Sequence, residues 1–507
     1  MLWLALHLPL LSLEAFAATL PAEAATGPLA LWREHRLTAV NPAAARGGVQ
    51  PGLRRTTAMA LLPALQLGQA DATRDAQALQ AVAHQALAFT PSVTLQEPAI
   101  VLMEVSTCLR YFGGLPALLA RLRQALAPLG HQLQIAAAPT ALGAALLARW
   151  RPGLEDGPHR SGLPALRALL DQAPVGLLVS GPAQAEAMAG MGLHRLGNLR
   201  RLPRDGLARR FGEPLLDALD RARGQRPDPR EWITAPPAFD SRLELPARAE
   251  ASEQVLHAAT LLLARLVAWA RARQGRIEAF TLSMHHEARH GEGLPEATTL
   301  RVALAEPSLD AGHLQGLLRE RLARCPLAAP TLELRLQCAS LARGEPPSGE
   351  LFASGHSQRE GLLRLLERLR ARLGDERVRQ WRPVADHRPE RATHSHATAG
   401  RGPGLRGVRD APPCDGAPPA PARPRPAWLL PEPRPLPERG PLPLLDGQPL
   451  QLLAGPERLE TGWWDGTPAT RDYFIAQAAD GALVWVYRAR LPPDPEASGW
   501  FLHGRFG

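Results

Sequence analysis

The chain has 507 residues, which is too long for one ordinary domain and predicts roughly three to five units, each with its own core. Its 58 Lys and Arg residues are all arginines, and against 49 Asp and Glu residues they give a net charge of +9. Guanidinium groups suit phosphate, so the charge fits a nucleic-acid partner. Four scattered cysteines exclude a disulfide scaffold and favour a reducing compartment.

The N-terminal stretch "MLWLALHLPLLSLEAFAA" is apolar enough to suggest a secretion signal. It lacks a basic first segment and is interrupted by His7, Pro9 and Glu14. We therefore expect a buried strand followed by a helix, and a cytoplasmic protein. No apolar run elsewhere suggests a membrane span by its length.

Strand-like and helix-like segments alternate through the first 165 residues, which predicts an α/β layer. The strands are "LWLALHL", "AIVLMEVS" and "HQLQIAAAPT"; the helices are "LLSLEAF", "DAQALQAVAHQALAFT", "LPALLARLRQALAPLG" and "ALGAALLARW". Residues 170–235 predict a small helical module, and residues 240–385 predict an α+β unit. A Gly/Pro-rich linker and a short aromatic, β-rich module follow.

Within this order, three segments resemble motifs of the Y-family DNA polymerases, specifically their ImuB-like branch. Where the family carries a metal-binding Asp in a pattern like "HVDMDAFFASVE", this chain has "ALHLPLLSLEAF", with His7 in place of the Asp. Pro42 and Ala45 replace the Tyr and Arg that hold the triphosphate in the family, and leave Arg46 as a nearby cation. In the second palm motif, "PAIVLMEVSTC", Ala99 and Ile100 occupy the catalytic acidic pair.

These replacements bear on two-metal phosphoryl transfer, which needs clustered carboxylate oxygens to hold two Mg²⁺ ions. Imidazole is a poor ligand for Mg²⁺, and Ala and Ile offer no ligand. We therefore expect a polymerase fold without polymerase chemistry, with no metal and no cofactor. The alternative is an active translesion polymerase that uses Mg²⁺ with a displaced carboxylate such as Glu14 or Glu104.

The resemblance implies a right-hand architecture of palm, fingers, thumb and little finger, with an added β-rich C-terminal module. The expected boundaries are palm 1–30 and 91–168, fingers 31–90, thumb 169–236, little finger 237–390, linker 391–426 and C-terminal module 427–507.

In the thumb, "MAGMGLHRLGNLRRLPRDGLARRFG" resembles the helix-hairpin-helix turn that presents backbone N–H groups to DNA phosphates. The expected non-sequence-specific DNA contacts are Gly190, Gly192, Arg195, Arg200 and Arg201. The alternative without a DNA-binding role is a Gly-containing helical turn with solvated arginines.

A sliding-clamp peptide like the family's "QLSLF" is expected near the end of the little finger, where Leu351 and Phe352 of "EPPSGELFASG" would fill the apolar pocket of the clamp. Ser348 replaces the anchoring Gln, which would weaken the affinity. The competing peptide "GQPLQLL" at 447–453 is expected to belong to the folded C-terminal module. A purely structural DNA-binding protein would have no clamp contact.

The C-terminal module has a signature typical of ImuB-like proteins, "GPERLETGWWDG" followed by further aromatic segments. The resemblance implies that a RecA-like ImuA protein and an error-prone C-family polymerase subunit assemble here. The candidate partner-binding residues are Trp463, Trp464 and Phe501. Of seven aromatic residues in the module, we expect most to form its core and one or two to be exposed.

Two histidine groups and an arginine stripe are interpreted as ordinary surface features. The "HHEARH" group (His285, His286 and His290) has no second ligand set with matching spacing, so zinc is not expected. The group around His387 borders the linker and predicts a solvated edge. The arginines of "LLLARLVAWARARQGR" are expected on a solvated helix face.

Overall fold

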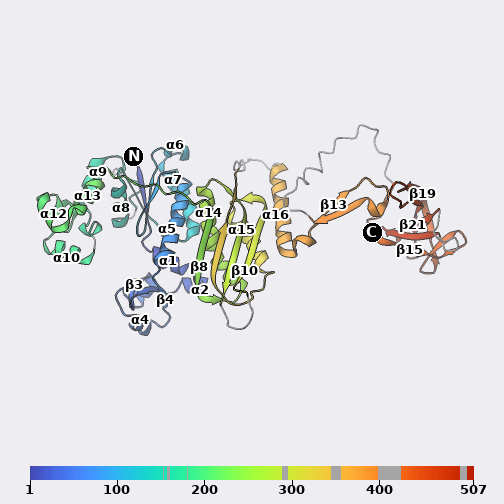
Figure 1. Cartoon of the computed structure of the whole chain (residues 1–507), viewed down its shortest axis with the longest axis horizontal. Coiled ribbons are helices and arrows are strands. Elements are labelled where there is room, and N and C mark those ends of the chain that lie inside the picture. The colour runs from blue at the N-terminus through green and yellow to red at the C-terminus, as the bar shows by residue number, and fades with distance from the viewer. Residues whose placement is uncertain are drawn as a thin grey trace. The chain divides into compact units, whose positions relative to one another are not determined.

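A computed structural model of the protein (Figure 1) describes residues 1–151, 153–156, 160–179, 181–287, 295–343, 355–397, 424–490 and 499–506. The chain divides into two compact units, Met1–Arg372 and Leu373–Gly507. This division falls inside the segment that the sequence assigned to the little finger. The expected mixture of α/β and α+β parts with a β-rich C-terminal module is confirmed.

The first sheet of unit Met1–Arg372 has the strand order β5-β6-β1-β7, and each neighbouring pair is antiparallel. Helices cover both faces, with α5 and α7 on one side and α8 on the other (Figure 1). The elements of this palm layer are β1 Trp3–His7, α1 Leu11–Ala17, α2 Ala22–Ala25, α5 Ala72–Leu87, β5 Val93–Gln96, β6 Ile100–Glu104, α6 Leu109–Phe112, α7 Leu115–Leu126, β7 Gln134–Ala138 and α8 Ala141–Trp150.

Strand β1, the apolar N-terminal stretch, is one of the two inner strands of this sheet and is buried on both faces. Leu4 and Leu6 pack against α5 and α7, whereas Trp3 and Ala5 pack against α8 and the helices that follow it. Because side chains alternate along a strand, a continuous apolar run is what burial on both faces requires. The expectation of a buried strand followed by a helix is confirmed for this stretch.

A small sheet of order β3-β2-β4 forms a separate layer with a core around Ala44, Val49 and Leu65. Its elements are β2 Leu29–Arg33, β3 Arg36–Val40, α3 Pro42–Arg46, α4 Arg55–Leu61 and β4 Gln66–Gln69. Helix α5 packs instead in the palm core, although the predicted fingers boundary of 31–90 included it. Its apolar face matches the sheet behind it, and a linear boundary could not separate the two layers.

The predicted helical module contains α9 Leu163–Gln172, α10 Pro182–Gly190, α11 Leu196–Leu199, α12 Arg204–Phe211 and α13 Glu213–Ala222. These helices share one core with α8 and with one face of the palm sheet. The turn that carries the candidate DNA contacts is therefore mounted on a packed scaffold.

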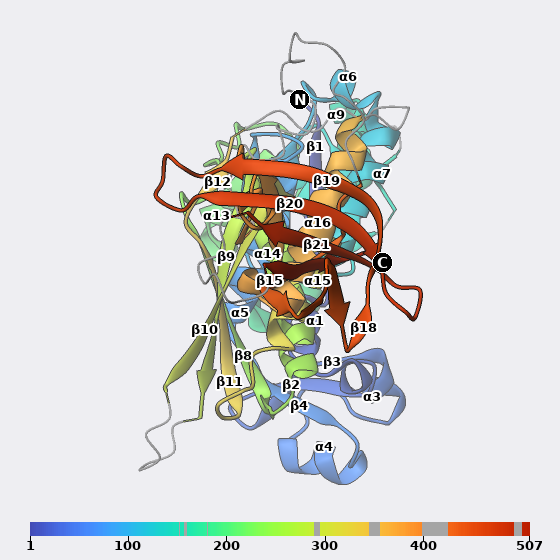
Figure 2. The same cartoon turned by 90° about the vertical axis from the view of Figure 1, so that its right-hand side faces the viewer.

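The α+β part has a sheet of order β10-β9-β11-β8, with α14 and α15 on one face (Figure 2). Its elements are β8 Phe239–Ala249, α14 Ser252–Ala272, β9 Arg276–His286, β10 Ala297–Ser308, α15 Ala311–Leu322, β11 Thr331–Cys338, β12 Leu341–Ala342 and α16 Gly355–Leu373. Among the described helices, α14 alone is long and apolar enough to cross a membrane by length and composition, contrary to the sequence-based expectation. Two thirds of it is buried within the fold, as in a core helix.

The arginine stripe of α14 is not simply a solvated face, as the sequence predicted. Arg265 is buried, and its guanidinium donates to Gln77 Oε1 and to Ser241 Oγ, at 3.2 Å each. Burial lowers the pKa of Arg265 to about 10. The helix turns this side chain toward α5 and β8, so helical spacing alone did not identify its exposed face.

Unit Leu373–Gly507 contains a curved sheet of order β15-β22-β21-β20-β19, whose strands β19, β20 and β21 run side by side in Figure 2. The strands of the whole unit are β13 Arg379–Pro383, β14 Thr393–Ala397, β15 Trp428–Leu436, β16 Glu438–Arg439, β17 Leu442–Leu445, β18 Gln448–Pro449, β19 Gln451–Thr461, β20 Ala469–Gln477, β21 Leu483–Ala489 and β22 Trp500–Arg505. Strand β14 lies inside the predicted linker of 391–426 and pairs with β13, so that segment begins as ordered structure.

Gly68 provides a test of packing between β4 and α1. A Cβ atom there would come within 2.6–2.7 Å of ring carbons of Phe16. We expect Gly68→Ala to lower the free energy of unfolding by about 1–3 kcal/mol, because the ring must move within a filled core. Urea unfolding of the full chain measures this. Gly206→Ala in α12, where a Cβ meets no atom within 4 Å, is the matched control and should be neutral or stabilising. Equal losses for both variants would contradict the packing.

Candidate functional site

By the resemblance to Y-family polymerases, the C-terminal end of β1 is the place where the metal-binding Asp of the family would lie. The strand register places His7 directly opposite Ile100 of β6 on one side and Gln134 of β7 on the other. His7 Nδ1 lies 3.0 Å from Gln134 Oε1, and desolvation of the half-buried ring lowers the pKa of His7. Of the three positions predicted to have lost their carboxylates, His7 and Ile100 are thus neighbours in space, although they lie 93 positions apart in the sequence.

Ala99 and Ile100 add no oxygen ligand through their side chains. Ile100 is buried, Ala99 packs against the palm core, and the Ala99 carbonyl accepts the Leu8 N–H at 2.9 Å. The groups that meet at this strand end are an imidazole, an amide and aliphatic carbons, a donor set that does not suit Mg²⁺. Within the described parts of the chain, no three His, Cys, Asp or Glu side chains are grouped so that they could hold a metal ion.

The two carboxylates considered as displaced ligands have other partners. Glu104 lies opposite Trp3, at the far end of β6, about 13 Å from Ile100 at a rise of roughly 3.3 Å per residue. Its Oε1 accepts the Leu2 N–H at 3.1 Å. Glu14 accepts the Gln132 N–H at 3.1 Å and lies 3.3 Å from His131 Nδ1. Both carboxylates therefore hold the palm together.

The predicted triphosphate grip falls on α3. Its start is fixed by Asn41, whose Oδ1 accepts the Ala44 N–H at 2.9 Å and the Leu29 N–H at 3.0 Å. Pro42 begins the helix, and Ala45 and Arg46 are exposed at its end. Arg46 is available to solvent there, and the structure gives it no companion Tyr or Arg at positions 42 and 45.

The thumb turn uses backbone N–H groups of its own to close α10. Gly190 ends α10, and Gly192 has φ +73°, a conformation that glycine adopts without strain. The N–H groups of Met191, Gly192 and Leu193 donate to carbonyls of Met188 and Ala189 at 2.9–3.1 Å. These three N–H groups therefore already have carbonyl partners in the closure of α10, and the DNA contacts expected at Gly190 and Gly192 stay a prediction.

The arginines of the turn are better placed for contact with a polyanion. Arg195 and Arg201 are exposed, with Arg195 at the start of α11. Arg200 is also exposed but donates to Asp171 Oδ2 at 2.6 Å. Residues 195–211 contain six exposed arginines and a single acidic residue, so this short segment carries a strong positive charge.

The predicted clamp peptide, with Leu351 and Phe352, lies outside the described residues. The competing peptide is folded as expected. Gln448 lies in β18, Leu452 packs on the core of the C-terminal sheet, and Leu453 is exposed on β19.

The C-terminal aromatic residues divide between core and surface as predicted. Tyr473, Trp485 and Trp500 are buried, whereas Trp463 and Trp464 are 79% and 56% exposed. The two exposed rings lie on the turn between β19 and β20, with centroids 5.4 Å apart and planes at 81°. Large exposed tryptophan rings are unusual on a protein surface, whereas tryptophan is enriched at protein interfaces. This turn is therefore the candidate docking element of the module.

Phe501, the third candidate, has a different environment. Its ring stacks on Tyr487 with centroids 5.0 Å apart and is partly buried, so it supports the sheet more than it presents a surface. Beneath it, Tyr473 Oη lies 2.8 Å from Nδ1 of the fully buried His503. Arg471 connects this pair to Glu390, with contacts of 3.0 Å on each side.

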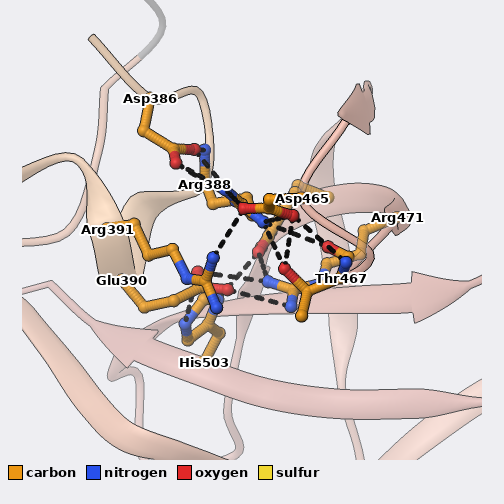
Figure 3. A network of polar contacts seen from close by, with 9 residues as sticks. Asp386, Arg388, Glu390, Arg391, Asp465, Thr467, Arg471 and His503 are labelled. Carbon is orange, nitrogen blue, oxygen red and sulfur yellow. Dashed lines mark hydrogen bonds and ion pairs between the residues drawn. The ribbon is translucent and has the colours of Figure 1, made fainter. Parts of the chain in front are cut away.

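Sequence reasoning missed Asp386, Arg388 and Glu390, which lie in a segment assigned to the little finger (Figure 3). Arg388 contacts Asp465 and Thr467 in the turn after β19, Glu390 contacts Arg471 of β20, and Asp386 contacts Arg388. The available signals were the Asp-X-Arg spacing at 386–388 and the Asp-Gly-Thr sequence at 465–467, which is typical of a side-chain-stabilised turn. Neither signal indicates that Arg388 pairs with Asp465, which lies 77 residues later in the sequence.

Comparison with known proteins finds similar proteins both by sequence and by structure. The chain is 30% identical over 486 residues to Protein ImuB of two strains of Caulobacter vibrioides, with 91% of this chain and 100% of each relative covered. A DinB-family error-prone DNA polymerase from Sulfolobus solfataricus and a Dbh ternary complex are each 14% identical, cover 68% and 67% of this chain and 100% and 99% of their own, and give TM-scores of 0.38 and 0.37. No protein-family model matches the chain.

The buried His503 predicts that unit Leu373–Gly507 is less stable in acid. Burial lowers the pKa of His503 to about 4, below its ordinary value near 6.5. The histidine binds a proton more readily in the unfolded chain than in the folded one. The free energy of unfolding therefore has its full value above a pH of about 6.5, and the contribution of neutral His503 is lost as the pH falls through about 4. Urea unfolding followed by fluorescence of Trp485, which stacks on this ring, measures it between pH 7.5 and 4.5. His503→Gln should flatten this pH dependence, and an unchanged slope would contradict the assignment.

Proposed function

The chain belongs to the ImuB family, and from this premise we propose that it is a Y-family polymerase homologue without polymerase chemistry. It acts as an adaptor in damage-induced mutagenic translesion DNA synthesis in the cytoplasm. In this role it binds DNA and the sliding clamp, and it recruits a RecA-like ImuA protein and an error-prone C-family polymerase.

The observation that carries the proposal is the register that sets His7 opposite Ile100. Two-metal catalysis needs carboxylates at neighbouring strand ends, where their oxygens can bridge both ions. The neighbouring strand ends here carry an imidazole bound to an amide and a buried aliphatic side chain. Supplying the missing ligands from Glu14 or Glu104 would break contacts that hold backbone N–H groups in the palm.

DNA binding is supported by the charge of the thumb segment 195–211. Exposed guanidinium groups contact phosphates without reading base sequence, which suits an adaptor that must act at any lesion. Because the turn amides are already used, the proposal assigns the contacts to arginine side chains, with Arg195 and Arg201 as the principal candidates. Gly190 and Gly192 shape the turn that carries them.

Clamp binding is assigned to Leu351 and Phe352, in the little-finger region of the sequence. Partner recruitment is assigned to Trp463 and Trp464, whose exposed rings can enter an apolar pocket of a protein. Phe501 is assigned a supporting role because its ring is stacked within the sheet.

Primer extension tests the loss of chemistry. With primed template, all four dNTPs and either Mg²⁺ or Mn²⁺, the purified chain should give no template-directed incorporation, because the described residues form no carboxylate cluster that could hold the two ions. An active Y-family polymerase purified by the same route is the control. Incorporation that persists through purification and disappears in Glu14→Gln or Glu104→Gln would establish the alternative of an active enzyme.

DNA affinity tests the thumb segment. Arg195→Ala and Arg201→Ala should each weaken binding to duplexes of unrelated sequence equally, and each should reduce the slope of log affinity against log salt by about 1, as expected for one lost phosphate contact. Fluorescence anisotropy across a salt series measures both quantities. Arg226→Ala removes the same charge from a residue paired with Asp217 and should leave the slope unchanged. Equal effects of all three variants would assign the binding to net charge alone.

Clamp affinity tests the peptide. The double variant Leu351→Ala, Phe352→Ala should weaken binding to a bacterial sliding clamp by about tenfold or more, because the two side chains fill its pocket. Surface plasmon resonance with immobilised clamp measures the affinity. Leu453→Ala, which truncates the exposed leucine of the competing peptide, is the control and should have no effect. An affinity unchanged by the double variant would remove this peptide and favour a structural DNA-binding protein without a clamp contact.

A further inference from the structure

The turn that presents Trp463 and Trp464 is shaped by one buried arginine. Arg388 comes from the segment before η5 (Pro389–Arg391), and its side chain is only 4% exposed. Its guanidinium lies between two carboxylates, as Figure 3 shows. Asp386 belongs to the same segment as the arginine, whereas Asp465 is the residue that directly follows the tryptophan pair.

The contacts of Arg388 are distributed so that they fix the turn at several atoms. Nη1 donates to Asp465 Oδ1 at 3.0 Å, and Nη2 donates to Asp465 Oδ2 at 2.6 Å. Nη1 also donates to the carbonyl of Thr467 at 3.0 Å and to its hydroxyl at 2.7 Å. Nε and Nη2 donate to Asp386 at 3.0 and 2.7 Å. A planar fork with two bidentate carboxylates restricts orientation as well as distance, which a lysine could not do.

The turn itself has the geometry that this arrangement needs. Asp465 Oδ1 accepts the N–H of Thr467 at 3.1 Å and its hydroxyl at 2.6 Å, which closes the loop after the tryptophans. Gly462 precedes the pair at φ +79°, and a Cβ there would come within 2.6 Å of Arg388 Nη1 and overlap the Thr467 carbonyl. The backbone therefore approaches the guanidinium closely on both sides of the two indoles.

A second arginine contacts the same carboxylate from outside. Arg391 Nη1 donates to Asp465 Oδ2 at 2.8 Å, but its side chain is about half exposed and makes this contact in solvent. Exposed ion pairs contribute little, whereas removing the central cation would leave Asp386 and Asp465 facing each other without it. The two arginines touch the same carboxylate yet differ in burial and in the number of contacts, so they form a matched pair for an experiment.

We propose that Arg388 is a positioning residue that holds Trp463 and Trp464 in the arrangement that binds a protein partner with an apolar pocket. This inference rests on the proposed role of the turn in partner recruitment. It makes the segment 386–391, which precedes residues 398–423 in the sequence, a functional part of the docking module. The indoles touch the partner, and Arg388 acts through the turn.

The experiment uses the full chain labelled with 5-fluorotryptophan. Arg388→Met keeps the length of the side chain and removes the fork, Arg388→Lys keeps the charge, and Arg391→Met is the control. In the ¹⁹F spectrum, both Arg388 variants should shift and broaden the signals of Trp463 and Trp464, assigned by Trp→Phe variants. The signals of Trp485 and Trp500, buried in the same sheet, should stay in place. Arg391→Met should change neither pair.

Partner binding is measured on the same proteins with a purified RecA-like ImuA protein as the probe. We expect Arg388→Met to lower its affinity about tenfold or more, and Arg391→Met to lower it less than twofold. Trp463→Ala with Trp464→Ala establishes whether the turn binds this probe. If that double variant lowers the affinity and Arg388→Met does not, the positioning role is overturned while the proposed function stands.

If the double tryptophan variant leaves the affinity unchanged, the recruitment role of the turn fails, and unmoved Trp463 and Trp464 signals in Arg388→Met would overturn the positioning role separately. Should Arg388→Met also displace the Trp485 and Trp500 signals, Thr467→Val replaces it. That variant removes the hydroxyl bonds to Arg388 and to Asp465 but no charge, and it should shift the same two signals by a smaller amount. Unmoved signals in Thr467→Val would then overturn the inference.

Discussion

Burial of β1 on both faces is the constraint on which the palm depends. A strand enclosed by helices on both sides must be apolar at successive positions, and each fully buried leucine contributes roughly 1.5–3 kcal/mol relative to an exposed one. The thumb helices join this layer through α8, and the small sheet of β3, β2 and β4 packs on α1, the helix that directly follows β1. The hydrophobic N-terminus that suggests export is therefore the centre of the fold.

The same burial explains how the end of β1 can be stable without metal-binding carboxylates. Carboxylates at the end of a buried strand are costly to desolvate unless cations or hydrogen bonds compensate for their charge. His7 with Gln134 and Ile100 meets the structural requirement without any ion, because an amide contact and aliphatic packing satisfy the strand end. The palm can then serve as a rigid support for a charged thumb, which is what the proposed adaptor role requires of it.

Periodicity and composition predicted most elements of the fold, because strands and helices that pack against a core carry apolar residues at their own spacing. The positions of β1, β6, β7 and α8 follow directly from apolar runs. The predictions that were wrong concerned contacts between segments that are far apart in the sequence. Helix α5 joined the palm instead of the fingers, and Arg265 turned inward because Gln77 and Ser241 lie there to accept its hydrogen bonds.

The candidate sites show the same limit at the level of single residues. The resemblance identified His7, Ile100 and the tryptophan pair, whose proposed roles follow from residue type at a known place in a strand or turn. It could not foresee that the amides of Gly192 and its neighbours are consumed in closing α10, because hydrogen bonding within a turn depends on φ and ψ rather than on the presence of glycine.

The docking turn shows how a polar core can replace apolar packing where aromatic side chains must remain outside. Trp463 and Trp464 cannot by themselves anchor their loop, since rings that are largely exposed to solvent contribute little buried area to it. A buried guanidinium between Asp386 and Asp465 supplies directional bonds instead, and such bonds specify one geometry where packing of small loop residues would allow several. Because one carboxylate precedes residues 398–423 and the other follows them, this geometry requires both segments. The functional boundary of the module therefore lies before the Gly/Pro-rich sequence, a position that composition alone does not indicate.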